Sequence, residues 1–206
     1  MSASTSGSSY PGKRCLDLIV MVVIAAPVVV IGSMCALAIK TTSRGPVFFR
    51  QHRIGRHGQI FRIWKFRTMV EGDNPIIPAA DRITGIGRLL RRLSLDELPQ
   101  LINVAKGDMS LVGPRPTLPY QADRWTDRQR RRLDARPGLT GLAQVGGRND
   151  LSWEERIELD LEYLSSPSLW QDVHIMIRTS TVLLSGSGAD ATVAHDPIAR
   201  VVEPAA

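Results

Sequence analysis

Cysteine and aromatic side chains are both scarce in this sequence. Its two cysteines, Cys15 and Cys35, lie in or beside one apolar run, with no CxxC motif and no histidine nearby. This arrangement argues against a zinc site and indicates small apolar side chains in a reducing compartment. Aromatic residues make up 5% of the chain, so no stacking platform for nucleic-acid bases is evident. We also find no internal repeat.

The length, composition and charge of the chain predict one folded domain with a net positive charge. The 206 residues suffice for one domain and not comfortably for two. Hydrophobic residues account for 43% and charged residues for 22%, which predicts a packed core and argues against wholesale disorder. The net charge of +6 favours an anionic partner, namely nucleic acid, acidic lipid headgroups or phosphorylated substrates. Composition does not choose among these three.

The strongest feature of the first half is an apolar run of 24 residues, LDLIVMVVIAAPVVVIGSMCALAI, at positions 16–39, with one charge, Asp17. The run is longer than the apolar region of a usual signal peptide and long enough for a transmembrane helix. Pro27 lies near its middle, where a proline removes a backbone hydrogen bond and bends a helix. Each arm is about 17 Å long, which is about half of a ~30 Å hydrocarbon core.

Positive charges flank the run on both sides, with Lys13 and Arg14 before it and Lys40 and Arg44 after it. By the positive-inside rule, both ends prefer the cytoplasmic side. We therefore predict that residues 13–40 form a re-entrant helix, broken at Pro27, that enters and leaves one leaflet. One alternative is a bent helix that spans the membrane with the domain on the cytoplasmic side. A buried core helix of a soluble protein is less favoured, because no face of the run is polar.

The rest of the chain predicts a compact domain over residues 41–185, of α/β type and mostly helical, between disordered tails at 1–12 and 186–206. Short strands are expected at 47–49 and 60–64 around a turn at 55–58. Two short helices, broken near Ser94, are expected within 85–104, and one helix at 122–138. Another helix is expected to start at Ser152, with Glu155 completing a capping box. A last helix at 169–184 would face either a core or a bilayer interface.

A cationic segment follows the apolar run directly. Positions 45–69 include Arg50, Arg53, Arg56, Arg62, Lys65 and Arg67. Such a charge run is usually a solvated face. Next to a membrane segment, contact with acidic headgroups or substrate phosphates is the competing interpretation.

The sequence Ser94-Leu95-Asp96-Glu97 has an ordinary interpretation as a helix start. Ser94 as N-cap and Glu97 three residues later form a capping box, with Asp96 in the first turn. A helix N-terminus lowers the pKa of a carboxylate, so Asp96 there would be ionised and available as a nucleophile or a ligand for a hard metal ion. Glu97 would act as a base or hold the second anionic group.

Three arginines are candidates for holding phosphate groups. Arg91 lies upstream of the carboxylates, Arg115 lies between two prolines that stiffen the backbone, and Arg148 lies in a glycine-rich turn. Guanidinium groups suit phosphate oxygens because they donate two hydrogen bonds at once. Carboxylates, a divalent ion and several arginines are what phosphoryl transfer requires, although each arginine alone is weak support.

Three motifs resemble those of the bacterial sugar transferases, namely the small monotopic polyprenyl-phosphate phosphoglycosyl transferases. The motifs are KFRTM at 65–69, SLDELPQLINVAKGDMSLVGPRP at 94–116 and RPGLTGLAQVGGRND at 136–150. The resemblance covers about residues 13–185. It implies a re-entrant membrane helix, amphipathic helices on the cytoplasmic leaflet, and a catalytic domain that faces the cytoplasm at the bacterial inner membrane.

The resemblance also implies a magnesium-dependent reaction in two steps. Asp96 would attack the β-phosphate of a UDP-sugar, release UMP and pass the phosphosugar to polyprenyl (undecaprenyl) phosphate. Asp96 would also contact Mg²⁺, Glu97 would assist, and Arg91, Arg115 and Arg148 would hold phosphate groups. Membrane lipids are expected partners, nucleic acid is not, and a homo-oligomer remains open.

Several positions depart from the family pattern. Ala26-Pro27 stands where the family often has Ser-Pro, and alanine offers no hydroxyl to the carbonyl that proline frees. Leu142 and Gly146 stand where Trp and Asn are common, and His52 where an acidic residue is common. Asp160 matches a family position to which the sequence assigns no role.

Two other classes of function compete with this interpretation. A membrane-anchored nucleic-acid binder would use the same arginines on phosphates, but it predicts a recognition helix or stacking aromatics, and neither is found. A non-catalytic membrane scaffold for polysaccharide assembly would not need the Asp96-Glu97 pair.

Overall fold

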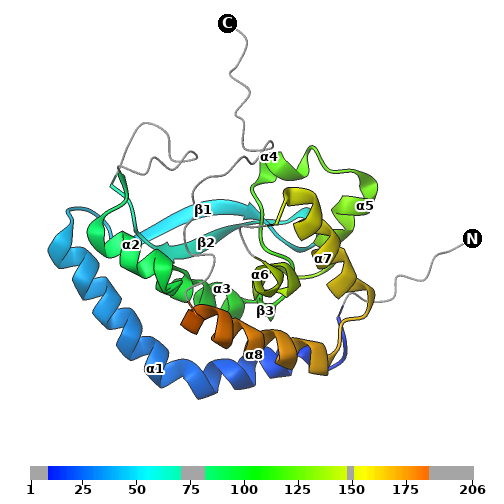
Figure 1. Ribbon diagram of the computed structural model, residues 1–206, viewed down its shortest axis with the longest axis horizontal. Coiled ribbons are helices and arrows are strands. Elements are labelled where there is room, and N and C mark those ends of the chain that lie inside the picture. The colour runs from blue at the N-terminus through cyan, green and yellow to red at the C-terminus, as the bar shows by residue number, and fades with distance from the viewer. Residues whose placement is uncertain (1–8, 71–81, 148–150, 186–206) are drawn as a thin grey trace, which may run out of the picture.

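The computed structural model describes residues 9–70, 82–147 and 151–185 of the chain. A long bent helix lies along one side of a mostly helical domain that contains two small sheets (Figure 1). The α/β-type, mostly helical fold expected from the sequence is therefore confirmed. Most of the two predicted tails, namely residues 1–8 and 186–206, lies outside the described residues. In chain order the elements are α1 (Lys13–Thr42), β1 (Phe48–Ile54), η1 (Arg56–Gly58), β2 (Ile60–Phe66), α2 (Gly85–Arg92), η3 (Leu95–Gln100), α3 (Leu101–Lys106), β3 (Ser110–Val112), α4 (Pro119–Ala122), α5 (Asp127–Arg130), η4 (Arg131–Asp134), β4 (Gly138–Thr140), α6 (Leu142–Gly146), α7 (Trp153–Ser165) and α8 (Leu169–Ser185).

Helix α1 is a single helix of 30 residues that continues through Pro27. Figure 1 shows that it bends midway, as expected where proline supplies no backbone N–H. It is long and apolar enough to cross a membrane, and 6% of its most apolar window is buried against the rest of the protein. Large apolar side chains such as Val22 and Val23 are therefore open to the surroundings.

The N-terminal end of α1 is tied to the domain by a buried polar cluster. The Lys13 ammonium lies 2.5 Å from Asp172 Oδ2 and donates to the Tyr163 hydroxyl at 3.0 Å. The hydroxyls of Tyr163 and Tyr10 donate to the same carboxylate at 2.7 and 2.8 Å. Because a buried charge is costly unless paired, this cluster holds α1 firmly against α7 and α8. Tyr10 falls within the tail predicted at residues 1–12, so the end of that segment belongs to the fold.

The first turn of α1 makes two further contacts with the domain. The Asp17 carboxylate accepts hydrogen bonds from the Ser110 hydroxyl at 2.9 and 3.0 Å and from the Leu111 amide at 3.0 Å, both in β3. The Arg14 guanidinium donates to carbonyls of α3 at 2.6 and 2.9 Å. The charge inside the apolar run and both cations that precede it therefore bind protein groups.

The C-terminal end of α1 packs against a different part of the same domain. Ile39 and Cys35 are buried in a cluster with Phe66 of β2 and Leu90 of α2. Arg67 closes this contact, because its guanidinium donates to the carbonyl of Ser43 at 3.0 Å and to the Ser43 hydroxyl at 2.7 Å. Both ends of the membrane helix are thus anchored to one domain.

The predicted strands around the glycine turn are confirmed and extend further than the sequence indicates. Strands β1 and β2 pair antiparallel in the register Phe48↔Phe66 to Ile54↔Ile60, and Gly58 takes a positive φ of 79° in the turn between them. A second, parallel pair joins β3 to β4. There Gly113 and Gly138 approach so closely that a Cβ on Gly138 would lie 2.1 Å from the Gly113 amide nitrogen.

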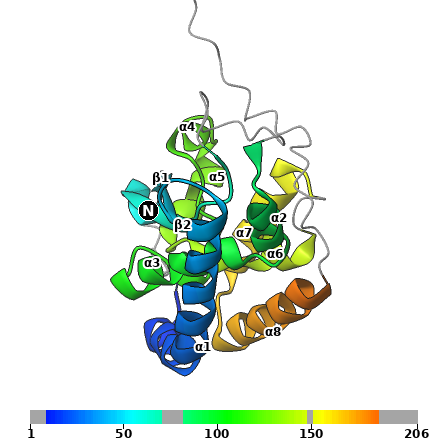
Figure 2. The same ribbon diagram turned by 90° about the vertical axis from the view of Figure 1, so that its left-hand side faces the viewer.

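The helix predicted over residues 122–138 is wrong in its extent. Separate short helices occupy this region, because Thr126 starts α5 with its own capping box and the chain then tightens into η4. The capping box at Ser152 and Glu155 is confirmed. The helix predicted at 169–184 is confirmed as α8, in which Trp170 is 80% exposed. Figures 1 and 2 both place α8 beside the N-terminal half of α1 at one end of the molecule, with α4 at the opposite end.

Candidate active site

The carboxylate pair lies on η3, directly after a sharp turn at the end of α2. The capping box expected at Ser94 does not form, because the Ser94 backbone is left-handed, with φ 54°, and its side chain makes no cap hydrogen bond. A serine cap needs an extended backbone instead. The element that follows is a 3-10 helix of six residues with Pro99 inside it, so it offers little of the dipole on which the sequence argument relied.

Glu97 is the centre of a charge network. Its Oε1 accepts from Lys65 Nζ at 2.6 Å and from Arg115 Nη2 at 2.7 Å. Burial alone would raise the pKa of Glu97, but the charges of Arg115 and Lys65 outweigh it and hold the pKa well below its ordinary value. Glu97 therefore stays ionised and joins η3 to β2 and to the loop that carries Arg115.

Asp96 has a different environment, although it is the neighbouring residue. It is buried, and its one ion pair with a described residue is to Lys65 Nζ, 4.0 Å from Oδ2. Burial raises its pKa, and the charge of Lys65 opposes that shift only in part. The expectation that a helix N-terminus lowers the pKa of Asp96 is therefore wrong, because loss of water outweighs the favourable charges here.

The sequence-predicted residues meet at this pair with two exceptions. Arg91 donates to the Thr68 hydroxyl at 2.9 Å, and its charge acts on Asp96. Arg115 contacts Glu97 and has a side chain that is 48% exposed, so it remains accessible from solvent. Arg148 lies outside the described residues. Pro27 lies within α1, as expected for the membrane segment, and not at the site.

Sequence reasoning did not single out Lys65, although it lies in the KFRTM motif. The alternation of side chains along β2 turns Lys65 toward η3, with the buried Ile63 on the same face. A charged residue within a strand that is otherwise largely apolar was the signal that could have identified it.

A buried ion pair lies behind Arg115. Arg132 Nη2 donates to Asp160 Oδ2 at 2.5 Å and to the Arg115 carbonyl at 3.3 Å. Both side chains are almost fully buried, and the Arg132 guanidinium lies over the Trp125 ring at 4.8 Å. Burial raises the pKa of Asp160, and the charge of Arg132 opposes the shift. This pair, together with the Gly113–Gly138 contact, fixes the backbone of the Arg115 loop, which gives Asp160 a structural role.

The described residues contain no cluster of three or more His, Cys, Asp or Glu side chains that could enclose a metal ion. Mg²⁺ does not need such a cluster, because it commonly binds one or two carboxylates together with substrate phosphates and water. Asp96 suits that mode. No hydrogen bond from a described residue occupies its oxygens, and a cation would offset its poorly compensated charge.

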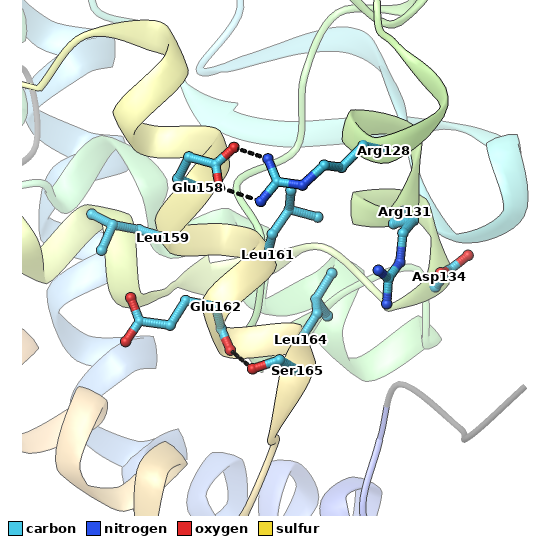
Figure 3. Close-up of a pocket in the computed structure, with 9 residues that line it drawn as sticks. All are labelled: Arg128, Arg131, Asp134, Glu158, Leu159, Leu161, Glu162, Leu164 and Ser165. Carbon is cyan, nitrogen blue, oxygen red and sulfur yellow. Dashed lines mark hydrogen bonds and ion pairs between the residues drawn. The ribbon is translucent and has the colours of Figure 1, made fainter.

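A surface cavity of about 410 Å³ lies between η4, α5 and α7, away from this pair (Figure 3). Arg128 and Glu158 form an ion pair at its edge, and Arg131, Asp134 and Glu162 also line it. None of the predicted site residues lies in its lining, so we place the active site at Asp96 and Glu97 instead.

Comparison with known proteins identifies a family whose model covers the site described above. A model of the bacterial sugar transferase family matches residues 8–186. The chain is 42% identical over 185 residues to the uncharacterized sugar transferase EpsL of Bacillus subtilis, covering 87% of this chain and 91% of EpsL. It is 44% identical over 190 residues to the UDP-glucose:undecaprenyl-phosphate glucose-1-phosphate transferase of Caulobacter vibrioides, covering 86% and 71%.

A third relative is considerably longer. The undecaprenyl-phosphate galactose phosphotransferase of Salmonella typhimurium is 40% identical over 201 residues, an alignment that covers 86% of this chain and 41% of that protein. The chain therefore spans less than half the length of this relative.

The buried Arg132–Asp160 pair predicts a specific effect on the Arg115 loop. Asp160→Asn removes the anion that pairs with a buried guanidinium, and we expect a loss of about 3–5 kcal/mol in stability. Hydrogen–deuterium exchange should become faster at the amides of Gly113, Arg115 and Thr117. Glu158→Gln is the matched control, since Glu158 forms an exposed ion pair from the same helix α7. Equal exchange in the two variants would contradict the role given to Asp160.

Proposed function

Because the chain belongs to the bacterial sugar transferase family, we propose that it moves the sugar phosphate of a UDP-sugar onto undecaprenyl phosphate through a covalent bond to Asp96, with release of UMP. The chain is a phosphoglycosyl transferase. One observation carries the covalent step. No hydrogen bond from a described residue engages the Asp96 oxygens, which lie 4.0 Å or more from Lys65 Nζ, while Glu97 is occupied by Lys65 and Arg115.

In the first step an Asp96 oxygen attacks the β-phosphorus of the donor. The new bond joins that oxygen to phosphorus, and the bond from phosphorus to the bridging oxygen breaks, so UMP leaves with the electron pair. The partly exposed Arg115 side chain and Arg91 lie close enough to the pair for their charges to act on Asp96. These charges would stabilise the negative charge that develops on the phosphate oxygens.

In the second step an oxygen of undecaprenyl phosphate attacks the same phosphorus. The bond between phosphorus and Asp96 breaks, which returns the free carboxylate and yields the sugar linked to the lipid through a diphosphate. Burial suits Asp96 to both steps, because a carboxylate with few hydrogen bonds is a stronger nucleophile than a well-solvated one. Glu97 keeps Lys65 and Arg115 in place throughout, so we assign it a positioning role and not that of a proton acceptor.

We also propose that Asp96 contacts Mg²⁺ when the donor is bound. The ion would supply positive charge to the diphosphate oxygens. The availability of the Asp96 oxygens supports this assignment, and the absence of a larger carboxylate cluster among the described residues suits an ion shared with substrate phosphates.

The membrane arrangement that we propose is a re-entrant α1 at the bacterial inner membrane, with the domain on the cytoplasmic side. Lys13 and Asp17 bind one part of the domain, and Ile39 and Ser43 bind another part. A helix that crossed the bilayer would leave its two ends on opposite sides, where one compact domain could not reach both. The exposed Trp170 and Ile177 of α8 support contact of that helix with the lipid interface.

The covalent step is tested by mass spectrometry of the protein after exposure to a panel of UDP-sugars without acceptor. We expect a phosphosugar adduct on Asp96, whose mass also identifies the sugar. Asp96→Asn should form no adduct and release no UMP, with expression unchanged. Turnover by Asp96→Asn at the wild-type rate would contradict the mechanism and would favour a non-catalytic scaffold.

The pH dependence of turnover tests the charge on Asp96. The nucleophile must be ionised, so kcat/KM for the donor should fall as the pH drops through the pKa of Asp96, which burial raises. Glu97 stays ionised over this range because its pKa is lowered. Lys65→Gln removes a charge that lowers the pKa of Asp96, and should move the acid limb to higher pH. Lys106→Gln is the control, and an acid limb that did not move in Lys65→Gln would refute the assignment.

Labelling of single cysteines tests the membrane arrangement. Ser9→Cys and Thr41→Cys, each in a Cys15→Ala, Cys35→Ala background, place one thiol beyond each end of the apolar segment. A reagent that does not cross membranes should label both positions in inverted vesicles and neither in spheroplasts. Labelling of the two positions from opposite sides would show a spanning helix.

A further inference from the structure

We propose that Arg53 binds the diphosphate of the sugar-nucleotide donor, beside Arg115 and Lys65. This inference rests on the proposed function and adds a residue that neither the sequence motifs nor the mechanism above uses. Three observations support it: the face of the hairpin on which Arg53 lies, the absence of a carboxylate partner, and the balance of charge around the Asp96-Glu97 pair.

The strand register places Arg53 on the inner face of the hairpin. Side chains alternate along β1, so Gln51 and Arg53 share a face with Ile63 and Lys65 across the pairs Gln51↔Ile63 and Phe49↔Lys65. Gln51 and Arg53 are half-buried, whereas Arg50 on the other face is exposed and stacks on the Trp64 ring at 4.3 Å. Arg53 therefore shares the face from which Lys65 reaches Glu97.

Two contacts connect Arg53 and its strand to the site. Its Nη2 donates to Gln51 Oε1 at 2.8 Å, and Gln51 lies between Arg53 and Phe49, the residue that pairs with Lys65. The next residue, Ile54, donates its amide to the Thr117 carbonyl at 3.0 Å, which joins the end of β1 to the loop of Arg115. The charges of both Arg115 and Glu97 act on Arg53, so it lies within electrostatic range of the network.

Arg53 is a cation of this network that lacks an anion of its own. Lys65 and Arg115 share Glu97, whereas no carboxylate of a described residue lies within ion-pair distance of Arg53. Its Nε is buried and has no hydrogen-bond partner. Burial, together with the charge of Arg115, lowers the pKa of Arg53 to about 10, although the charge of Glu97 opposes the shift. Such an arrangement costs stability, which is expected where a site is built for a charged ligand.

The charge balance identifies the chemistry of that ligand. Lys65, Arg53, Arg91 and Arg115 face two carboxylates, and one of these, Glu97, is already engaged. An anion with several oxygens would restore the balance, and a guanidinium can donate to two phosphate oxygens at once. Both the donor diphosphate and the phosphate of the lipid acceptor have this chemistry. We assign Arg53 to the donor, because its strand is joined to the loop that presents Arg115.

The test compares binding of UDP and uridine to the detergent-solubilised full chain by calorimetry. In Arg53→Gln the dissociation constant for UDP should rise about tenfold or more, as expected for the loss of hydrogen bonds to a charged group, with uridine binding unchanged. Arg53→Lys keeps the charge but loses the paired donors, and should lose several-fold in affinity. Arg50→Gln, the same change on the outer face of the same strand, should bind UDP as the wild type does.

Three results with Arg53→Gln would overturn the inference. UDP binding at the wild-type level in Arg53→Gln would do so, and so would an equal loss of uridine binding, which indicates a structural role. A rise in KM for undecaprenyl phosphate with UDP binding unchanged would also overturn it, because Arg53 would then serve the acceptor. If Arg53→Gln does not fold, as judged by thermal unfolding, wild-type UDP affinity in Arg53→Lys decides against it. Failure of the proposed function would be recognised separately, because the wild-type protein itself would then form no phosphosugar adduct on Asp96.

Discussion

The carboxylate of Glu97 joins three parts of the chain that are far apart in the sequence. Through Lys65 it holds β2, through Arg115 it holds the loop after β3, and it belongs to η3 itself. Without this anion, Arg115 would lose its ion pair and Lys65 would keep only its longer pair with Asp96, which is unfavourable at a partly buried position. The position of the neighbouring Asp96 depends on the same arrangement, because η3 is the element that carries both residues.

The two carboxylates illustrate how environment divides the roles of adjacent residues. Glu97 is surrounded by cations, and its pKa is lowered despite burial. Asp96 is buried, its one ion pair with a described residue is the 4.0 Å pair with Lys65, and its pKa is raised. One residue is therefore a fixed negative charge that organises the site, and the other is the carboxylate that we propose as the nucleophile. Two residue types that look interchangeable in a sequence motif acquire different chemistry from their neighbours.

The membrane helix and the catalytic domain are one structural unit. Asp17, the single charge in the apolar run, binds β3, whose parallel partner β4 fixes the backbone that precedes Arg115. The far end of α1 packs on Phe66, which ends the strand that carries Lys65. The position of the helix is thereby coupled through short backbone paths to both cations that contact Glu97. This coupling suits a site that must meet a soluble donor and a lipid-bound acceptor.

Much of the fold and part of the site follow from local sequence. The apolar run, the hairpin around Gly58, the capping box at Ser152 and the carboxylate pair are readable because helix period, turn residues and motif spacing act over a few residues. Local sequence does not predict the left-handed turn at Ser94 or the raised pKa of Asp96. Nor does it predict that Lys65 pairs with Glu97, or that Arg132 pairs with Asp160. Each of these depends on which distant side chains share a buried space, and burial and charge pairing between distant segments arise only when the chain has folded.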